Sequence, residues 1–410
     1  MKNTTRFYLI GFLRGLYFYL PLFTVFLTGH DVGMEIVVFS QFFYSFVQFI
    51  AEVPTGVLAD KLGQRASMIV GYFIEALGLV TVVLFPTAIG ACLCYAIGGL
   101  AAAFLSGSEE ALLFESAKKE KADYGAAYGK FLSNATIGMI VATGLGGFAY
   151  AAWGAEIAPA LLWATAIALM ICAFLSFGFP ELRSAADVQK QKGSGMWKSV
   201  TQGYEAIKKE DFLRNMTIVM LLIVPGEYFL YNIYQPLFEG VHVEPIWFGL
   251  SISLGLAFNA FVMRYMSWFE RRFTLPTLIF AVSVIIGMGY FLVSLTSSPW
   301  VAVTSVIMML GFVEVHRPII SDYLNERIAS HQRTTVLSLL SFTNRVASAA
   351  LRIVLALTVA GYSVAASGVV HGVYLMGGAI ISYWLLAKCG CAHRIKHPPK
   401  IHTPSSVAVG

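Results

Sequence analysis

The sequence predicts an all-α membrane protein with twelve transmembrane helices, and three observations lead to this fold class. Hydrophobic residues make up 57% of the 410-residue chain and charged residues only 12%, about half the charged fraction of a soluble domain. Apolar runs of about 20 residues, long enough to cross the hydrocarbon core of a bilayer, recur along the whole chain. Positive charge is confined to alternate connections between these runs. A soluble protein with a large core would still need a polar shell, which this composition does not supply.

Each apolar run is expected to form one helix across the membrane. The predicted spans are residues 7–29, 34–56, 66–86, 88–112, 124–150, 157–179, 213–239, 244–268, 275–297, 299–323, 334–361 and 363–387. Polar groups interrupt the fourth, tenth and eleventh of them. The first run carries Arg14 and has no small-residue cleavage site near its end, so we expect a span rather than a secretory signal.

The distribution of lysine and arginine predicts the orientation, because these residues concentrate in cytoplasmic connections. Of the 28 lysines and arginines, 21 lie in the two tails and the even-numbered connections, seven lie within spans, and the odd-numbered connections contain none. Both termini are therefore expected in the cytoplasm. The net charge of +5 follows from this bias and indicates no nucleic-acid partner. The cysteine usage and the short outer connections favour a bacterial inner membrane.

The domain organisation follows from the longest connection, which separates two sets of six spans. Residues 1–180 are predicted as an N-terminal half and residues 213–390 as a C-terminal half. Residues 181–212 form a cytoplasmic loop, in which residues 196–209 have the apolar spacing of an amphipathic helix on the membrane face. The tail, residues 391–410, mixes proline with serine and threonine and is expected to be disordered.

The connection after the second span carries a recognisable motif, Gly56-Val-Leu-Ala-Asp60-Lys-Leu-Gly63-Gln64-Arg65. It resembles the signature loop of the major facilitator superfamily, Gly-x-Leu-Ala-Asp-Arg/Lys-x-Gly-Arg-Arg/Lys, and departs from it only at Gln64. The resemblance implies the major facilitator fold, with two pseudo-symmetric halves of six helices. It also implies that Gly56, Asp60, Gly63 and Arg65 form a conformational switch that latches the halves together.

The residue types suit such a switch. Gly56 allows two helices to approach closely, and Gly63 permits a tight turn. Asp60 can pair with Arg65 or cap a neighbouring helix. The alternative is a charged turn that only sets the topology.

Two departures from the drug exporters of that family bear on function. Those exporters carry an arginine in the fourth span, which is missing from Ala96–Leu100. They also carry a Gly-Pro-x-x-Gly-Gly motif in the fifth span, linked to antiport. The matching stretch Ala142–Gly147 keeps the last two glycines and lacks the proline. Close helix packing is therefore expected at these glycines, whereas membership of the drug–proton antiporters does not follow.

Ionisable residues within spans are costly in lipid and usually face a cavity or a partner. Glu227 lies near the middle of the seventh span, and Tyr231 and Gln235 follow on the same helix face. Glu227, Glu314 and Glu52 are therefore the candidates for proton coupling. For Glu227 the alternative is a structural ion pair with a buried arginine. Glu52 lies near the cytoplasmic end of its span, where gating or pairing with the signature loop is also expected.

In members of the family, helices 1, 4, 7 and 10 line the central cavity, which implies a set of substrate contacts. The candidates from these helices are Arg14, Tyr231, Gln235 and Arg317, and the eleventh span adds Asn344 and Arg345. Glu75 and the aromatic residues 17–19 are weaker candidates.

Two pairs of these residues have an open interpretation. Glu314 and Arg317 are three residues apart and can neutralise one another within one turn. Arg345 and Arg352 share one face of the eleventh span. They can hold an anionic substrate, or they can pair with carboxylates of neighbouring helices.

These features predict a secondary transporter, driven by protons, that moves a small organic solute across the inner membrane by alternating access. Export is favoured over uptake, and proton-coupled uptake of an anionic metabolite is the alternative. The chain lacks a nucleotide-binding Gly-x-x-x-x-Gly-Lys-Ser/Thr loop and the motifs of a membrane-embedded enzyme, and a channel would not need the signature latch. We expect a monomer in the lipid bilayer, with a small-molecule substrate and H⁺ as partners and no cofactor. The five cysteines match no standard zinc site, so no metal is expected.

Overall fold

The computed structural model describes most of the chain. The described residues are 2–180, 208, 210–226, 229–313, 315–316, 319–320, 324 and 333–388, apart from the side chains at 53, 60, 226, 232, 333–338, 341 and 342. The regular secondary structure in this part is helical. The predicted amphipathic helix at 196–209, except residue 208, and the tail at 391–410 lie outside the described residues.

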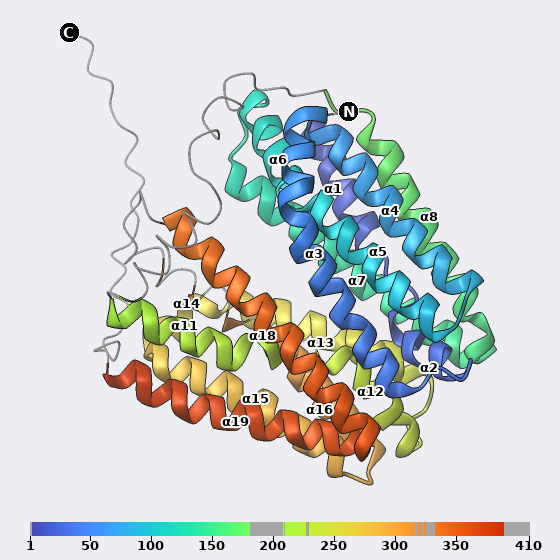
Figure 1. The fold of residues 1–410 in the computed structure, drawn as a ribbon, viewed down its shortest axis with the longest axis vertical. Coiled ribbons are helices and arrows are strands. Elements are labelled where there is room, and N and C mark those ends of the chain that lie inside the picture. The colour runs from blue at the N-terminus through green and yellow to red at the C-terminus, as the bar shows by residue number, and fades with distance from the viewer. Residues whose placement is uncertain are drawn as a thin grey trace.

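Two groups of helices lie side by side (Figure 1). The first contains α1 (Asn3–Arg14), η1 (Leu20–Leu22), α2 (Phe23–Thr28), α3 (Met34–Leu62), α4 (Gln64–Leu84), α5 (Ala88–Leu105), α6 (Ser108–Lys119), α7 (Tyr124–Trp153), η2 (Ala155–Ile157) and α8 (Ala158–Ser176). The second contains α11 (Asp211–Ile223), η4 (Val224–Gly226), α12 (Leu230–Gly240), α13 (Ile246–Arg264), α14 (Met266–Arg272), α15 (Leu275–Leu295), α16 (Pro299–Phe312), α18 (Arg333–Gly361) and α19 (Val364–Lys388). We refer to these two groups as the first and second halves.

Not every predicted span is one continuous helix. Nine helices in the described residues are long and apolar enough to cross a membrane. The first predicted span breaks after α1 and continues through η1 and α2, and the seventh breaks at η4 between α11 and α12. Pro21 and Pro225 lie at these breaks. Proline has no N–H group to donate to the hydrogen bonds of a helix, so it favours an interruption at such a position. Interruptions at corresponding places in the two halves of a transporter point to its binding site.

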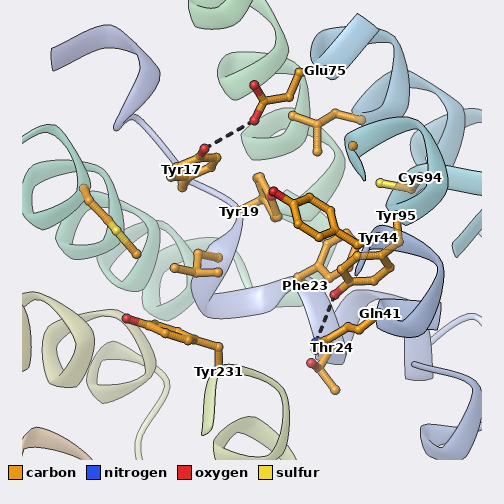
Figure 2. Close-up of a pocket in the computed structure, with 14 residues that line it drawn as sticks. Tyr17, Tyr19, Phe23, Thr24, Gln41, Tyr44, Glu75, Cys94, Tyr95 and Tyr231 are labelled. Carbon is orange, nitrogen blue, oxygen red and sulfur yellow. Dashed lines mark hydrogen bonds between the residues drawn. The ribbon is translucent and has the colours of Figure 1, made fainter. Parts of the chain in front are cut away.

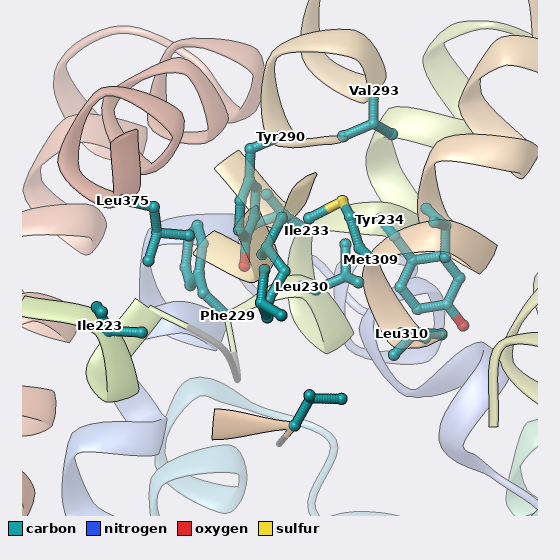
Figure 3. Packing of buried hydrophobic residues seen from close by; sticks show 14 of the residues in the cluster. Ile223, Phe229, Leu230, Ile233, Tyr234, Tyr290, Val293, Met309, Leu310 and Leu375 are labelled. Atoms are coloured by element: carbon teal, nitrogen blue, oxygen red, sulfur yellow. The ribbon is translucent and has the colours of Figure 1, made fainter. Parts of the chain in front are cut away.

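Each half has its own hydrophobic core. In the first half, Phe7 packs ring against ring with Phe131 and Phe179, and all three are fully buried. In the second half, buried side chains of α12 such as Ile233 lie among residues of α15, α16 and α19 such as Tyr290 (Figure 3). Close packing of these large side chains stabilises each helix group, because van der Waals contact supplies the attraction between helices in a bilayer.

The outward faces of the helices are also apolar. Ile89, Phe174 and Ile380 have exposed fractions of 72%, 75% and 62%. In water, large exposed apolar areas of this kind would promote association. In a bilayer they contact lipid, and the helical backbone keeps its polar groups bonded internally.

The two halves converge at the end that carries α2 and α12 (Figure 1). Near this end, α7 of the first half packs closely against α13 of the second. A Cβ atom on Gly147 would lie only 2.8 Å from the Cα atom of Gly249, and the hydroxyls of Thr143 and Ser253 lie 2.9 Å apart. The close packing expected at the fifth-span glycines is therefore present: Gly147 meets a helix of the other half, and Gly146 meets the backbone of Phe18 in its own half.

The signature loop is reduced to a single linking residue. Gly63 alone joins α3 to α4, with a φ of 97° that residues carrying a Cβ rarely adopt. A Cβ on Gly56 would meet no described atom within 4 Å, so the expected close helix contact is not made in this conformation. Nη1 of Arg65 donates to the backbone oxygen of Phe179 at 3.2 Å. The side chain of Asp60 lies outside the described residues.

Candidate functional site

A cavity of about 390 Å³ lies at the break in the first predicted span (Figure 2). Its walls are mainly aromatic, with a few polar groups, and consist of Tyr17, Tyr19, Leu20, Phe23, Thr24, Gln41, Tyr44, Glu75, Leu79, Cys94, Tyr95, Gly98, Met139 and Tyr231. Most belong to the first half, and Tyr231 comes from α12 of the second. The cavity is therefore bounded by both halves, and it has the volume of a small-molecule pocket.

The cavity forms where the chain leaves helical geometry between α1 and η1. Thr165 on α8 bonds the irregular backbone: its hydroxyl donates to the oxygen of Leu16 at 3.0 Å and accepts from the N–H of Phe18 at 3.1 Å. Non-helical backbone at membrane depth persists only where protein or water satisfies its polar groups in this way. As a result, the link can direct the side chains of Tyr17 and Tyr19 into the cavity.

Glu75, on α4, is the only charged side chain among the described lining residues. The hydroxyl of Tyr17 donates a hydrogen bond to Oε1 of Glu75 at 3.3 Å (Figure 2). A carboxylate inside a membrane is costly unless a partner or a proton offsets its charge. One hydrogen bond from a neutral phenol leaves that charge in place, so the site can accept a proton or a positively charged group here.

Aromatic rings form a continuous series along the cavity wall. The ring centroids are 6.2 Å apart for Tyr17 and Tyr19, 5.2 Å for Tyr19 and Phe23, and 5.8 Å for Phe23 and Tyr95, each pair edge to face. Nε2 of Gln41 donates to the hydroxyl of Tyr95 at 3.5 Å. An aromatic lining with a few convergent polar groups is typical of a site for a small organic molecule.

An ion pair outside the cavity lining joins a buried carboxylate to an arginine whose side chain is 30% exposed. The guanidinium of Arg14 pairs with Glu109 on α6, and the other oxygen of Glu109 accepts a hydrogen bond from the hydroxyl of Tyr72. The Arg14 guanidinium also lies 5.5 Å from the ring centroid of Phe131. Arg14, a predicted substrate contact, is thus matched by Glu109 in this conformation and does not belong to the lining.

Two arginines of α18 hold this helix against α3 of the first half. Arg345 donates from two nitrogens to the two carboxylate oxygens of Glu52, at 2.7 and 3.2 Å. Arg352 donates to the backbone oxygen of Gln41 at 2.9 Å and to the hydroxyl of Ser45. Glu52, a candidate for proton coupling, and Arg345, a candidate for substrate binding, are therefore paired with one another between the halves.

Gln235 also joins the halves, through backbone groups. Its Oε1 accepts from the N–H groups of Thr24 at 2.9 Å and Val25 at 3.2 Å, and its Nε2 donates to the oxygen of Leu20 at 2.9 Å. Gln235 is fully buried and does not belong to the described lining. Tyr231, one turn earlier on α12, does.

The structure describes one of the four remaining predicted site residues. Glu227, Glu314 and Arg317 lie outside the described residues, and their roles stay predictions. Asn344 is half-buried on α18, beside Arg345.

Among the lining residues that the sequence did not single out are Thr24, Gln41, Tyr44 and Tyr95. Gln41 and Tyr44 are three residues apart on α3, and Tyr95 and Gly98 have the same spacing on α5. This spacing places each pair on one helix face. A polar or aromatic face within an apolar span was therefore the available signal.

Comparison with known proteins identifies the family. A family model described as the Major Facilitator Superfamily matches residues 7–351. The chain belongs to the major facilitator superfamily. No curated protein sequence matches this superfamily member.

Several solved structures resemble this major facilitator protein over nearly its whole length. The nucleoside transporter NupG is 14% identical, with a TM-score of 0.74 and coverage of 95% of this chain and 99% of that one. A D-xylose-proton symporter is 14% identical, with a TM-score of 0.69 and coverages of 92% and 96%. A POT family transporter in complex with 5-aminolevulinic acid is 10% identical, with a TM-score of 0.72 and coverages of 94% and 96%. At these identities the likeness shows the fold alone.

Proposed function

We propose that this protein is a proton-coupled secondary transporter that exports a small organic solute across a bacterial inner membrane by alternating access. The cavity between the two halves carries the proposal, because it places the carboxylate of Glu75 among aromatic and amide side chains. Membership of a transporter family supports the transport of a solute. A D-xylose-proton symporter has a similar fold, so this fold is compatible with proton coupling.

In the proposed cycle, Glu75 is the residue that gains and loses the proton. Closing the cavity around a charged carboxylate is costly, whereas closing it around a protonated one is not. The protonation state of Glu75 therefore biases which conformation the transporter adopts. Glu227 and Glu314 remain further candidates for the same role.

The conformation described here is inferred to be open to the cytoplasm. The halves converge at α2 and α12 and diverge toward the end that carries the N-terminus (Figure 1). The distribution of lysine and arginine assigns that N-terminal end to the cytoplasm. The glycine contact between α7 and α13 would then have to separate before the cavity opens outward.

The alternative function, uptake of an anionic metabolite, has less support. None of the described lining residues is a lysine, arginine or histidine. Arg345 and Arg352 of α18, which were candidates for binding an anion, form hydrogen bonds with α3 instead.

The test is solute-driven proton flux in vesicles that contain the purified protein and an internal pH dye. Pools of organic cations, organic anions and neutral solutes are added separately to the wild type, Glu75→Gln and Glu156→Gln. Glu156 is an exposed carboxylate of η2, away from the cavity, and serves as the matched control. We expect one pool to drive proton flux in the wild type and in Glu156→Gln, and at least a tenfold loss in Glu75→Gln.

Two results would count against the proposal. Flux that survives Glu75→Gln would remove Glu75 from the coupling step and move the assignment to Glu227 or Glu314. Absence of flux with every pool, in wild-type protein shown to be folded, would contradict proton-coupled transport itself.

A further inference from the structure

We propose that the transported solute is a small organic cation, an amine with an apolar body, held between Glu75 and the tyrosine rings of the cavity. This inference rests on the proposed transport function and names the substrate class of the same cavity. It departs from the anionic substrate that Arg345 and Arg352 could hold according to the sequence alone.

The charge of the lining is the first argument. Glu75 is its only charged member among the described residues, and its partner there is the neutral hydroxyl of Tyr17. Arg14, the cation behind the wall, is already paired with Glu109. An anionic solute would therefore meet a like charge, whereas an ammonium group would offset the carboxylate of Glu75.

The aromatic rings are the second argument. A cation within about 6 Å of a ring centroid is attracted by the negative face of the ring, and quaternary ammonium groups are recognised by cages of such rings. Tyr17, Tyr19, Phe23 and Tyr95 follow one another edge to face along the wall, and Tyr44 adds a further ring. With many rings beside one carboxylate, the site can bind a positive charge through cation–π contacts as well as through an ion pair.

The volume sets the size of the solute. A water molecule takes up about 30 Å³ of liquid, so a cavity of about 390 Å³ holds on the order of a dozen non-hydrogen atoms. The amide of Gln41 and the hydroxyl of Thr24 lie in the wall together with apolar groups such as Leu79. A cation with a compact hydrocarbon or aromatic body therefore fills the site better than a polyhydroxylated one.

Equilibrium binding to the purified full-length protein tests the substrate class, using three probes of matched size. The probes are benzyltrimethylammonium, the anion 3-phenylpropionate and the neutral ketone 4-phenylbutan-2-one. We expect benzyltrimethylammonium to bind at least tenfold more tightly than either of the others, and the tyrosine rings to contribute through their faces. Tyr44→Phe, which keeps the ring, should retain binding, whereas Tyr44→Leu should weaken it severalfold.

Variants at the carboxylate complete the test. Glu75→Gln should weaken binding of benzyltrimethylammonium at least tenfold and leave the neutral ketone unchanged, whereas Glu156→Gln should alter neither. The comparison of the three probes on the wild type needs no substitution, so it decides the matter even if Glu75→Gln fails to fold. Binding of 3-phenylpropionate as tight as that of the cation, or no saturable binding of the cation, would overturn the proposal.

Failure of the substrate class and failure of the transport function give different results. If anionic or neutral solutes drive Glu75-dependent proton flux and cations do not, the substrate class is wrong and proton-coupled transport stands. If benzyltrimethylammonium binds as expected and no solute drives flux, the binding site stands and proton-coupled transport does not.

Discussion

At the scale of single residues, the structure is governed by how each buried charge is matched. Arg14 is paired with Glu109, which also accepts from Tyr72, whereas Glu75 has one hydrogen bond from a neutral tyrosine. Removing one member of a buried pair leaves the other charge uncompensated, which costs more than the pair itself contributes. The first pair is therefore structural in this conformation, and Glu75 is the group that we propose to change its charge.

We expect Arg14→Met to destabilise the protein by about 3–5 kcal/mol, the cost of leaving a buried charge unpaired. The double variant Arg14→Met with Glu109→Gln removes both charges and should recover a large part of this loss. The measurement is the midpoint of denaturant unfolding in detergent. Equal destabilisation by the single and double variants would show that the pair has no such structural role.

At the scale of elements, close helix approach joins the halves at one end. Gly147 of α7 and Gly249 of α13 let two backbones meet, as small residues do between membrane helices. The sequence identified Gly147 through a partial motif, but it placed no partner opposite this glycine. The partner depends on how α7 and α13 are rotated about their axes, and hydrophobic periodicity does not fix that rotation in a helix that is apolar all round.

Gly147→Ala should therefore destabilise the closed end, because the added Cβ would overlap the backbone of Gly249. Overpacking of this kind typically costs about 1–3 kcal/mol. Gly129→Ala is the control on the same helix, since a Cβ at Gly129 would meet no described atom within 4 Å. The melting temperature should fall for Gly147→Ala and stay level or rise for Gly129→Ala, and a fall of the same size in both would refute the role of this contact.

At the scale of the whole molecule, the sequence predicts the family and the helical class but only part of the site. Apolar runs and the loop around Gly63 lead to a major facilitator protein, which the family match confirms. The breaks at Pro21 and Pro225 were not predicted, because proline within a long apolar run is also compatible with a kinked helix. Tyr44 and Tyr95 were also missed. Residue spacing shows which residues share a helix face with them, but it does not show which other helix that face meets.

A contact between distant segments at the start of α1 also depends on pH. The Glu120 carboxylate accepts from the N–H groups of Asn3 and Thr4 and, at 2.6 Å, from the Thr4 hydroxyl, and so caps α1. Desolvation alone would raise the pKa of Glu120, but these hydrogen bonds and the charge of Lys2 outweigh it and lower the pKa. The stabilisation is therefore fully present above about pH 4.3, the usual pKa of an unfolded glutamate, and is lost as the pH falls through the lowered folded-state value.

Glu120→Gln should accordingly reduce the loss of stability on acidification. The measurement is the melting temperature of wild type and variant between neutral pH and about pH 3, which spans the usual glutamate pKa. The wild type should be the more stable above that pKa, and the difference should shrink below it. A difference that does not change with pH would show that the Glu120 carboxylate makes no such contribution.

The central claim is that the cavity between the halves opens alternately to the two sides of the membrane. Cys94 lies in its wall (Figure 2) and can serve as the only cysteine once Cys92, Cys172, Cys389 and Cys391 are replaced by serine. The measurement is the labelling of Cys94 by a membrane-impermeant maleimide, applied from each side in turn, with and without a proton gradient. We expect labelling from the cytoplasmic side at rest and from the outer side when the gradient drives the cycle. Labelling from one side alone under every condition would rule out alternating access.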